Sequence, residues 1–254
     1  MTESNMGSFS RRVMMRLAAG GAVAGSVNWL SAEAGATPAA DNRLGEGDVV
    51  LFQGDSITDA GRSRQQTGAN NLGALGHGYP MMLGTQLLGM HPYKKLQVYN
   101  RGISGHKVPD LAKRWQKDTI DLKPSLLSIL IGVNDIWHKL GGRYNGTVED
   151  YDTGFTKLLA DTRAALPDVR LVVCEPFVLK TGAVNDSWFP EFDQRRAVAK
   201  KVAEAAGATW VPWQSVFDEA AKHAPDKHWL GDGVHPTTAG HALMAATWLD
   251  AVKP

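Results

Sequence analysis

Two short stretches of the chain contain residue types that together can transfer acyl groups. FQGDSITD places Ser56 directly after an apolar run, and GDGVHP places Asp232 three residues before His235. A serine hydroxyl is a weak nucleophile until a neutral imidazole takes its proton, and the imidazole needs a carboxylate to fix its tautomer and stabilise its charged form. We therefore predict that Ser56, His235 and Asp232 act as nucleophile, general base and orienting acid.

The same chemistry needs hydrogen-bond donors for the oxyanion of the tetrahedral intermediate. Two turns offer them: NRGISGHKV contains Gly105, and IGVNDIW contains Asn134. We expect the backbone N–H groups of Ser56 and Gly105 and the side-chain amide of Asn134 to be the donors, since a glycine lets the backbone approach a ligand closely. A helix cap is the alternative role for Asn134, although Asp135 is the better candidate for that position.

Each catalytic candidate also has an ordinary structural alternative. Ser56 could cap a turn, and His235, which precedes a proline, could stand at the start of a helix. Asp55 is a rival partner for the imidazole. Because it adjoins Ser56, it is better placed to hydrogen-bond the backbone of the turn, and we assign it a structural role.

Bringing these residues together requires strands that end close to them. Five short runs rich in Val, Ile, Leu and aromatic residues are typical of strands, at 48–53, 95–100, 126–132, 169–176 and 208–213. Apolar residues recur at helical spacing between them and at the end of the chain, around 80–90, 109–118, 151–166, 197–206 and 235–253. Pro236 is expected in the first turn of the last helix.

This alternation predicts a parallel sheet covered on both faces, in a three-layer α/β/α sandwich. Ligands bind beyond the carboxyl ends of the strands in such sheets, and Ser56, Gly105 and Asn134 all follow predicted strands. In the stretches at about 60–78 and 178–192, apolar residues do not recur at a helical or strand spacing, so we expect these stretches to form loops over the site.

Four sequence blocks carry a resemblance to a known family. GDSI with Ser56, the SG turn with Gly105, GVND with Asn134 and DGVH with His235 resemble, in order, the blocks of the SGNH or GDSL hydrolase superfamily. GDSITDAGR, GALGHGYP, NRGISGHKVPDL and DGVHPTTAGH are most similar to bacterial acetylxylan esterases and related carbohydrate deacetylases. The resemblance implies a flavodoxin-like fold with a central parallel five-stranded sheet, and removal of acetyl groups from xylan, xylo-oligosaccharides or similar sugars. The chain lacks the G-x-S-x-G elbow of another hydrolase fold.

Aromatic side chains near the predicted site are candidates for holding a sugar ring. Trp137 follows the Asn134 turn, Trp229 precedes Asp232, and Trp188 lies in the long loop after the fourth strand. Plain packing is the alternative for each, since aromatic residues dominate cores. His106, next to Gly105, is a further candidate for contact with substrate, with a solvated turn histidine as the alternative.

The beginning of the chain resembles a twin-arginine export signal. Residues 1–36 contain Arg11 and Arg12, then a mildly apolar stretch, then small residues suited to a signal peptidase. The apolar part, roughly 17–30, is shorter than the ~20 residues of a membrane-spanning helix, so no stable anchor is expected. We predict a cleaved signal at 1–36, a flexible segment at 37–46, a hydrolase domain at 47–254, and a periplasmic or extracellular location. A disordered N-terminus is the alternative.

Composition narrows the classes of partner. The formal net charge is +1 and no basic run is present, so nothing favours nucleic-acid binding. The single cysteine, Cys174, excludes an internal disulfide. The eight histidines match no familiar ligand spacing, so we expect no metal and no cofactor. The sequence does not indicate an oligomeric state.

The predicted protein is an exported serine esterase that deacetylates carbohydrates through an acyl-enzyme. A lipid- or thioester-directed esterase of the same mechanism is one alternative, although the loop RSRQQTGANNLGALGHG offers little apolar surface for a long acyl chain. A non-catalytic carbohydrate-binding protein on this fold is another, since fold does not fix function.

Overall fold

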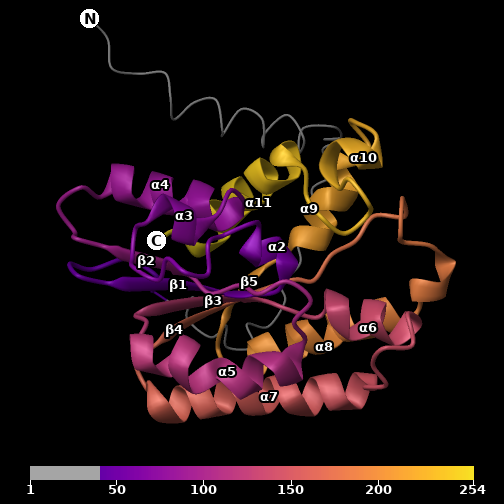
Figure 1. The fold of residues 1–254 in the computed structure, drawn as a ribbon, viewed down its shortest axis with the longest axis horizontal. Coiled ribbons are helices and arrows are strands. Elements are labelled where there is room, and N and C mark those ends of the chain that lie inside the picture. Colours follow the sequence, from indigo (N-terminus) through magenta and orange to yellow (C-terminus); the bar gives the residue numbers. More distant parts are fainter. Residues whose placement is uncertain (1–40) are drawn as a thin grey trace, which may run out of the picture. The chain divides into compact units, whose positions relative to one another are not determined.

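The computed structural model describes residues 41–254, and its centre is a five-stranded parallel sheet (Figure 1). The strand order is β2-β1-β3-β4-β5. The strands are β1 Val49–Gly54, β2 Gln97–Asn100, β3 Leu126–Leu130, β4 Arg170–Cys174 and β5 Thr209–Val211. All five strands predicted from the sequence are present, and the predicted sandwich is confirmed.

Both faces of the sheet are covered, because its strands are apolar on both sides. In β1, Val50 and Phe52 belong to one buried cluster and Leu51 to the other. The first cluster includes side chains of α4 (Tyr79–Met90), α9 (Trp213–Ala220) and α11 (Thr238–Val252). The second includes side chains of α5 (Val108–Asp118), α7 (Val148–Ala165) and α8 (Glu191–Ala205). Figure 1 shows these two sets of helices on opposite sides of the sheet.

The helices differ from the predicted ones in three respects. The last helix, α11, begins at Thr238 with Thr237 as its N-cap, so the prediction that Pro236 lies in its first turn is wrong. The hydroxyl of Thr237 accepts from the backbone N–H of Gly240, a cap that proline cannot supply. The helix α6 (Val133–Leu140) was anticipated only through a possible cap at Asn134 or Asp135, with no predicted range, and α9 was not predicted. Each is only eight residues long and closely follows a strand.

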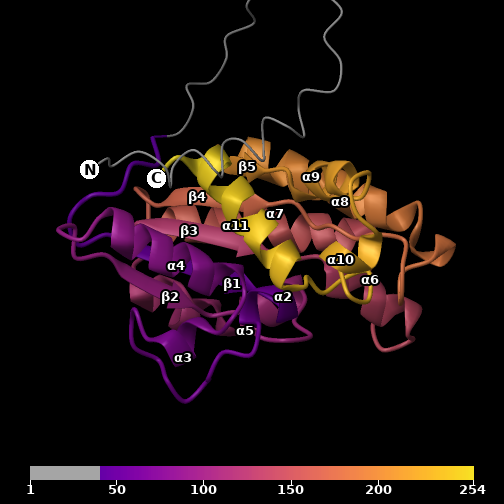
Figure 2. The same ribbon diagram turned by 90° about the horizontal axis from the view of Figure 1, so that it is seen from above.

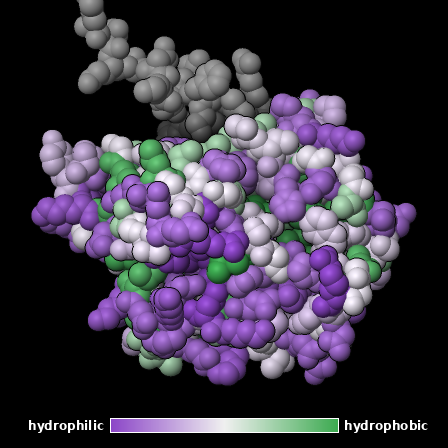
Figure 3. Space-filling view, in the orientation of Figure 1, coloured by the Kyte–Doolittle hydropathy of each residue, from purple (hydrophilic) through white to green (hydrophobic). Residues whose placement is uncertain are grey.

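Short helical turns complete the chain: α2 Ser56–Asp59, α3 Leu72–Leu75, η1 Ile120–Leu122, η2 Asp186–Trp188 and α10 Asp226–Trp229. The predicted loops at 60–78 and 178–192 thus contain α3 and η2. Seen from above, α11 runs beside α4 across one face of the sheet (Figure 2). The face seen in Figure 3 is mostly hydrophilic, with apolar side chains in small separate spots, as expected when the apolar residues fill the two layers.

From Asn42 onward, the chain packs against the sheet and its covering helices. Asn42 and Leu44 are buried, and Asn42 Nδ2 donates to Thr209 Oγ1 at 2.8 Å. Part of the segment expected to be flexible, 37–46, is therefore held against the edge of β5. The predicted export signal, 1–36, lies outside the described residues. Within residues 41–254, no helix is both long and apolar enough to cross a membrane.

Candidate active site

The turn after β1 holds Ser56 at the start of a helix. Gly54 has φ +159, and a Cβ there would lie 2.4 Å from the carbonyl oxygen of Leu130, so β1 and β3 approach too closely for a side chain. Asp55 then caps α2, since its Oδ1 accepts from the backbone N–H of Ile57 at 3.0 Å. Ser56 is the first residue of α2, and its hydroxyl lies at the carboxyl edge of the sheet.

A tight loop before α11 positions the imidazole. Leu230 and Pro236 form an antiparallel bridge, and Gly231 N donates to His235 O at 2.9 Å. Gly233 has φ +89, and a Cβ there would lie 2.2 Å from the carbonyl oxygen of Thr181. Only glycine fits that position, and the loop therefore folds back on itself between Asp232 and His235.

The three predicted catalytic side chains form one hydrogen-bonded line. Ser56 Oγ lies 2.8 Å from His235 Nε2, and His235 Nδ1 lies 2.7 Å from Asp232 Oδ2. With Asp232 ionised, Nδ1 carries the proton and donates it to the carboxylate, which leaves Nε2 as an acceptor for the serine hydroxyl. This arrangement can withdraw a proton from Ser56.

The surroundings of Asp232 keep its carboxyl group charged. Its Oδ1 accepts from the backbone N–H groups of Val234 at 2.9 Å and His235 at 2.7 Å. Partial burial alone would raise the pKa of Asp232, but the hydrogen bonds donated by His235 and Val234 outweigh it, so the pKa is lowered. The carboxylate that faces the imidazole is thus ionised at neutral pH.

The three predicted oxyanion donors belong to turns at the same edge of the sheet. Ser56 N stands at a helix start, where no helical carbonyl is available to it. The turn that contains Gly105, φ +81, packs on this start, since Ile103 N donates to Gly54 O at 3.1 Å. Asn134 Nδ2 donates to His106 O at 3.2 Å, directly beside Gly105. An amide nitrogen carries two hydrogens, so that bond orients Asn134 and leaves one hydrogen for a ligand.

Neither Asn134 nor Asp135 caps the helix that follows β3. The N-cap of α6 is Gly132, with φ +134, and Asn134 is the second helical residue. A Cβ at Gly132 would lie 2.8 Å from the hydroxyl oxygen of Tyr151, so the turn needs glycine there. The expected cap Asp135 is therefore wrong: its side chain is fully buried, and burial raises its pKa to about 7, against the opposing effect of the Arg195 guanidinium.

The second aspartate near the imidazole has a structural environment, as predicted. Asp55 is fully buried, and its Oδ2 has no hydrogen-bond partner among residues 41–254. Burial raises the pKa of Asp55 to about 7, although the N–H of Ile57 and the nearby imidazole of His235 act in the opposite direction. Asp55 holds the turn that presents Ser56.

The three tryptophans predicted to contact substrate occupy different environments. The ring of Trp137 is half-buried with its centre 5.7 Å from that of His235, and Trp188 lies behind it at 5.7 Å. Trp188 is only 2% exposed and donates its indole N–H to Ala183 O, so it supports Trp137 and has no free face for a sugar. Trp229, the last residue of α10, contacts the ring of His228. Its indole N–H donates to Ala220 O at the end of α9, so it joins the two helices.

His106 is held by an arginine that the sequence did not single out. Arg114 Nε donates to His106 Nδ1 at 3.1 Å, so a neutral His106 carries its proton on Nε2. Burial and the charge of Arg114 both lower the pKa of His106. Arg114 also donates to Gln53 Oε1 and Arg101 O, which ties the ends of β1 and β2 together. Apart from an ion pair with Asp118, four residues further along α5, these contacts join residues that are eight or more positions apart, and no local sequence signal marks them.

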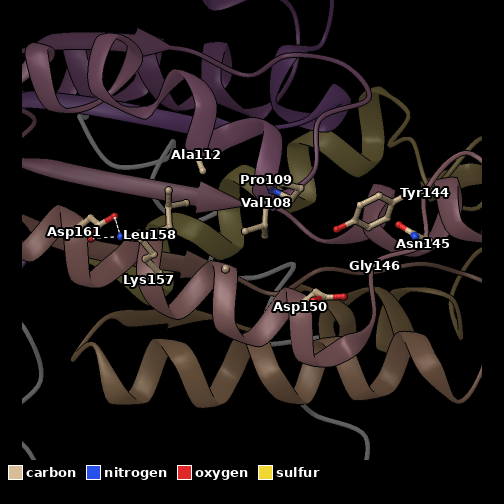
Figure 4. A pocket seen from close by; sticks show the side chains of 11 residues that line it. Val108, Pro109, Ala112, Tyr144, Asn145, Gly146, Asp150, Lys157, Leu158 and Asp161 are labelled. Carbon is tan, nitrogen blue, oxygen red and sulfur yellow. Dashed lines mark hydrogen bonds and ion pairs between the residues drawn. The ribbon is translucent and has the colours of Figure 1, made fainter.

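A hollow of about 510 Å³ lies between α5 and α7, beside this edge of the sheet (Figure 4). Val108 and Pro109 from α5, Leu158 from α7 and Tyr144 from the preceding loop line it, and none of the predicted site residues does. The hollow is therefore separate from the Ser56 hydroxyl. Within residues 41–254, no cluster of three or more His, Cys, Asp or Glu side chains is placed to hold a metal ion.

Comparisons with known proteins assign the chain to a family. The sequence model of the GDSL-like lipase/acylhydrolase family matches residues 52–243. An acetylxylan esterase from Geobacillus stearothermophilus is 34% identical over 211 residues, which cover 82% of this chain and 94% of that protein.

Two solved structures are similar to this one in fold and sequence. A protein from Parabacteroides merdae, described as a candidate GDSL-like lipase, has a TM-score of 0.82 at 45% identity, covering 84% of this chain and 99% of that one. A catalytic mutant of Axe2, an acetylxylan esterase from Geobacillus stearothermophilus, has a TM-score of 0.74 at 33% identity, covering 82% and 95%. The chain thus belongs to the GDSL-like lipase/acylhydrolase family, the SGNH hydrolases, and is a carboxylic ester hydrolase.

Proposed function

We propose that this protein is a serine esterase that removes acetyl groups from carbohydrates such as acetylated xylan or xylo-oligosaccharides. The observation that carries the proposal is the hydrogen-bonded line from Ser56 through His235 to Asp232, at 2.8 and 2.7 Å. The geometry matches the roles of a nucleophile, a general base and an orienting acid.

In the proposed reaction, Ser56 Oγ attacks the acetyl carbonyl carbon while His235 Nε2 takes the hydroxyl proton. The tetrahedral intermediate collapses, the C–O bond to the sugar breaks, and the proton passes from His235 to the departing sugar oxygen. Water then attacks the acetyl-enzyme while His235 takes its proton. The bond between the acetyl carbon and Ser56 Oγ breaks, His235 returns the proton to Oγ, and acetate leaves. The N–H groups of Ser56 and Gly105 and the amide of Asn134 stabilise the negative oxygen in both halves.

Three catalytic mutants of Axe2 support these assignments. These mutants replace a serine, an aspartate and a histidine of that enzyme by alanine. In Axe2 the serine precedes the histidine by 179 residues, and the aspartate precedes it by three. Ser56 and Asp232 stand at the same two separations from His235. Carbohydrate as substrate is supported by the name of this relative and by Trp137, whose ring lies beside the imidazole.

Acetate release from acetylated xylo-oligosaccharides tests the proposal. Ser56→Ala should lower kcat by roughly 10⁴-fold or more, because the remaining groups cannot form an acyl-enzyme. Ser215→Ala, which removes an exposed hydroxyl from α9, is the matched control and should keep full activity. A Ser56→Ala enzyme that still releases acetate at the wild-type rate would contradict the assigned nucleophile.

A lipid- or thioester-directed esterase is the second candidate, favoured by the family description as lipase and acylhydrolase. A long acyl chain needs an apolar groove at the nucleophile, whereas the apolar hollow between α5 and α7 is lined by none of the predicted site residues. Rates on acetyl and octanoyl esters of one alcohol decide between the two. We expect the acetyl ester to react faster, and a preference for octanoyl would favour the lipid-directed enzyme.

We further propose that residues 1–36 are an export signal removed from a mature protein with the hydrolase domain at 47–254. The support is the order of charged, apolar and small residues around Arg11 and Arg12. The mass of the protein recovered from the periplasm or medium should lack the signal. Replacing both arginines by lysine should leave the uncut precursor inside the cell, and unchanged export would contradict a twin-arginine route.

A further inference from the structure

The helix that carries Asn134 has little intrinsic stability. α6 contains eight residues, and an isolated helix of that length is marginal. An oxyanion donor nevertheless has to be held to within about 0.5 Å of its productive position. Contacts from elsewhere in the fold must therefore fix α6.

An ion pair joins the last turn of α6 to α8. Nζ of Lys139 lies 3.0 and 2.8 Å from the two carboxylate oxygens of Glu191, the first residue of α8. The same carboxylate accepts from Nη2 of Arg195 at 2.6 Å. Partial burial alone would raise the pKa of Glu191, but the hydrogen bonds from Lys139 and Arg195 lower it on balance. Glu191 is thus a charged link between the two helices.

Arg195 extends this link to the other end of α6. Its side chain is fully buried, and Nη2 also donates to Gly146 O at 3.0 Å, in the loop after α6. Its guanidinium carbon lies 5.7 Å from the centre of the Tyr151 ring. The Tyr151 hydroxyl in turn donates to Ile131 O at 3.0 Å, directly before α6. One connected set of contacts therefore reaches both ends of the helix.

A buried carboxyl group on α6 adds an attraction to the same arginine. Nε and Nη1 of Arg195 and both carboxyl oxygens of Asp135 have no hydrogen-bond partner among residues 41–254. The Arg195 charge acts on Asp135, since it opposes the rise in pKa that burial causes. Arg195 already pairs with Glu191, so this attraction to Asp135 is a smaller addition to the contacts that hold α6 against α8.

We propose that Lys139, Glu191 and Arg195 are positioning residues of the oxyanion hole, which fix α6 and, through α6, the side-chain amide of Asn134. The inference rests on the proposed function, in which Asn134 donates to the oxyanion. Because these residues act through Asn134 and not on the ground-state substrate, their loss should lower kcat and leave KM nearly unchanged.

Lys139→Met is the first variant, because Glu191 still pairs with the buried Arg195 in it. We expect kcat on an acetylated xylo-oligosaccharide to fall about tenfold, part of the ~10²–10³-fold that loss of an oxyanion donor costs, with KM within about twofold. Lys139→Arg keeps the ion pair and should retain kcat. Lys222→Met, which breaks an exposed pair with Glu219, is the matched control and should change neither constant.

A double-mutant cycle tests whether the effect passes through Asn134. In the Asn134→Ala background, Lys139→Met should cause no further loss of kcat. An equal loss in both backgrounds would overturn the inference, and so would unchanged kcat in both Lys139→Met and Glu191→Gln. If Asn134→Ala alone leaves kcat unchanged, the proposed role of Asn134 itself fails, which is a different result.

Discussion

Two aspartates lie close to the imidazole of His235, one in the turn after β1 and one in the loop before α11. Asp55 adjoins Ser56 in the sequence, whereas Asp232 stands far along the chain and three residues before the histidine. Both carboxyl groups interact with the imidazole. Asp232 Oδ2 lies 2.7 Å from His235 Nδ1, and the charge of His235 opposes the rise in the pKa of Asp55 that burial causes. The two regions nevertheless give their carboxyl groups opposite properties.

The difference comes from burial and hydrogen bonds. The side chain of Asp232 is 42% exposed and its oxygens accept three hydrogen bonds, so its pKa is lowered. Asp55 is fully buried with one oxygen unpartnered, and its pKa is raised to about 7. A carboxylate that must stay charged beside an imidazole needs solvent and donors, and adjacency to the nucleophile supplies neither.

The largest expected effect separates the two aspartates by activity. Asp232→Asn should lower kcat about 10⁴-fold, because an amide in place of the carboxylate favours the wrong tautomer of His235. Asp55→Asn keeps an oxygen that accepts from Ile57 N, so kcat should fall by less than about tenfold. Steady-state acetate release measures both. Equal losses in the two variants would remove the distinction between the regions.

Stability against pH tests the same distinction with a smaller effect. The pKa of Asp55 is about 7 when folded and near 3.8 when unfolded, so the folded protein binds more protons between these values and loses stability as pH rises through them. The Asp55→Asn variant has no carboxyl group at this position, so its stability does not fall in this way as the pH rises. Its free energy of unfolding relative to wild type should rise by roughly 1 kcal/mol per pH unit between about pH 4 and 7.

Urea denaturation of both proteins at pH 4.5, 5.5, 6.5 and 8 measures this difference. A difference in free energy of unfolding that is the same at every pH would show that Asp55 is ionised when folded, like Asp232. The comparison between the two regions would then rest on hydrogen bonds alone.

The smallest expected effect concerns the aromatic neighbour of the imidazole. Trp137→Ala should lower kcat/KM about tenfold, since the ring packs beside His235 and supplies the apolar face proposed to contact the sugar. Trp137→Phe should lose less. Trp229→Phe, at the last residue of α10, should change kcat/KM less than Trp137→Ala does, and the opposite order would place the sugar on the Trp229 side of the site.

Much of this site could be predicted from the sequence because its residues follow apolar runs. The runs at 48–53 and 126–132 are largely buried on both faces, and the run at 95–100, at the edge of the sheet, alternates buried with more exposed residues. Both patterns are typical of strands, and the turns after these three runs carry Ser56, Gly105 and Asn134. The carboxyl ends of these parallel strands lie at one edge of the sheet, so the turns that follow them come together there regardless of the conformation of the other loops.

The remaining features depend on contacts between distant residues. The pair of Lys139 with Glu191 joins positions 52 residues apart, and neither residue type marks it. Trp137 and Trp188 have the same chemistry, and only packing decides that Trp188 is buried behind Trp137. A glycine instead of Asp135 caps α6, because Tyr151 leaves no room for a side chain there.

Covalent labelling by a fluorophosphonate, followed by peptide mass mapping, tests the central claim most directly: Ser56 is activated by His235, and His235 is held by Asp232. The account predicts a single adduct on Ser56 that forms at a similar rate in wild type and Asp55→Asn and far more slowly in Asp232→Asn. An adduct on another residue, or an Asp232→Asn protein labelled as fast as wild type, would contradict it.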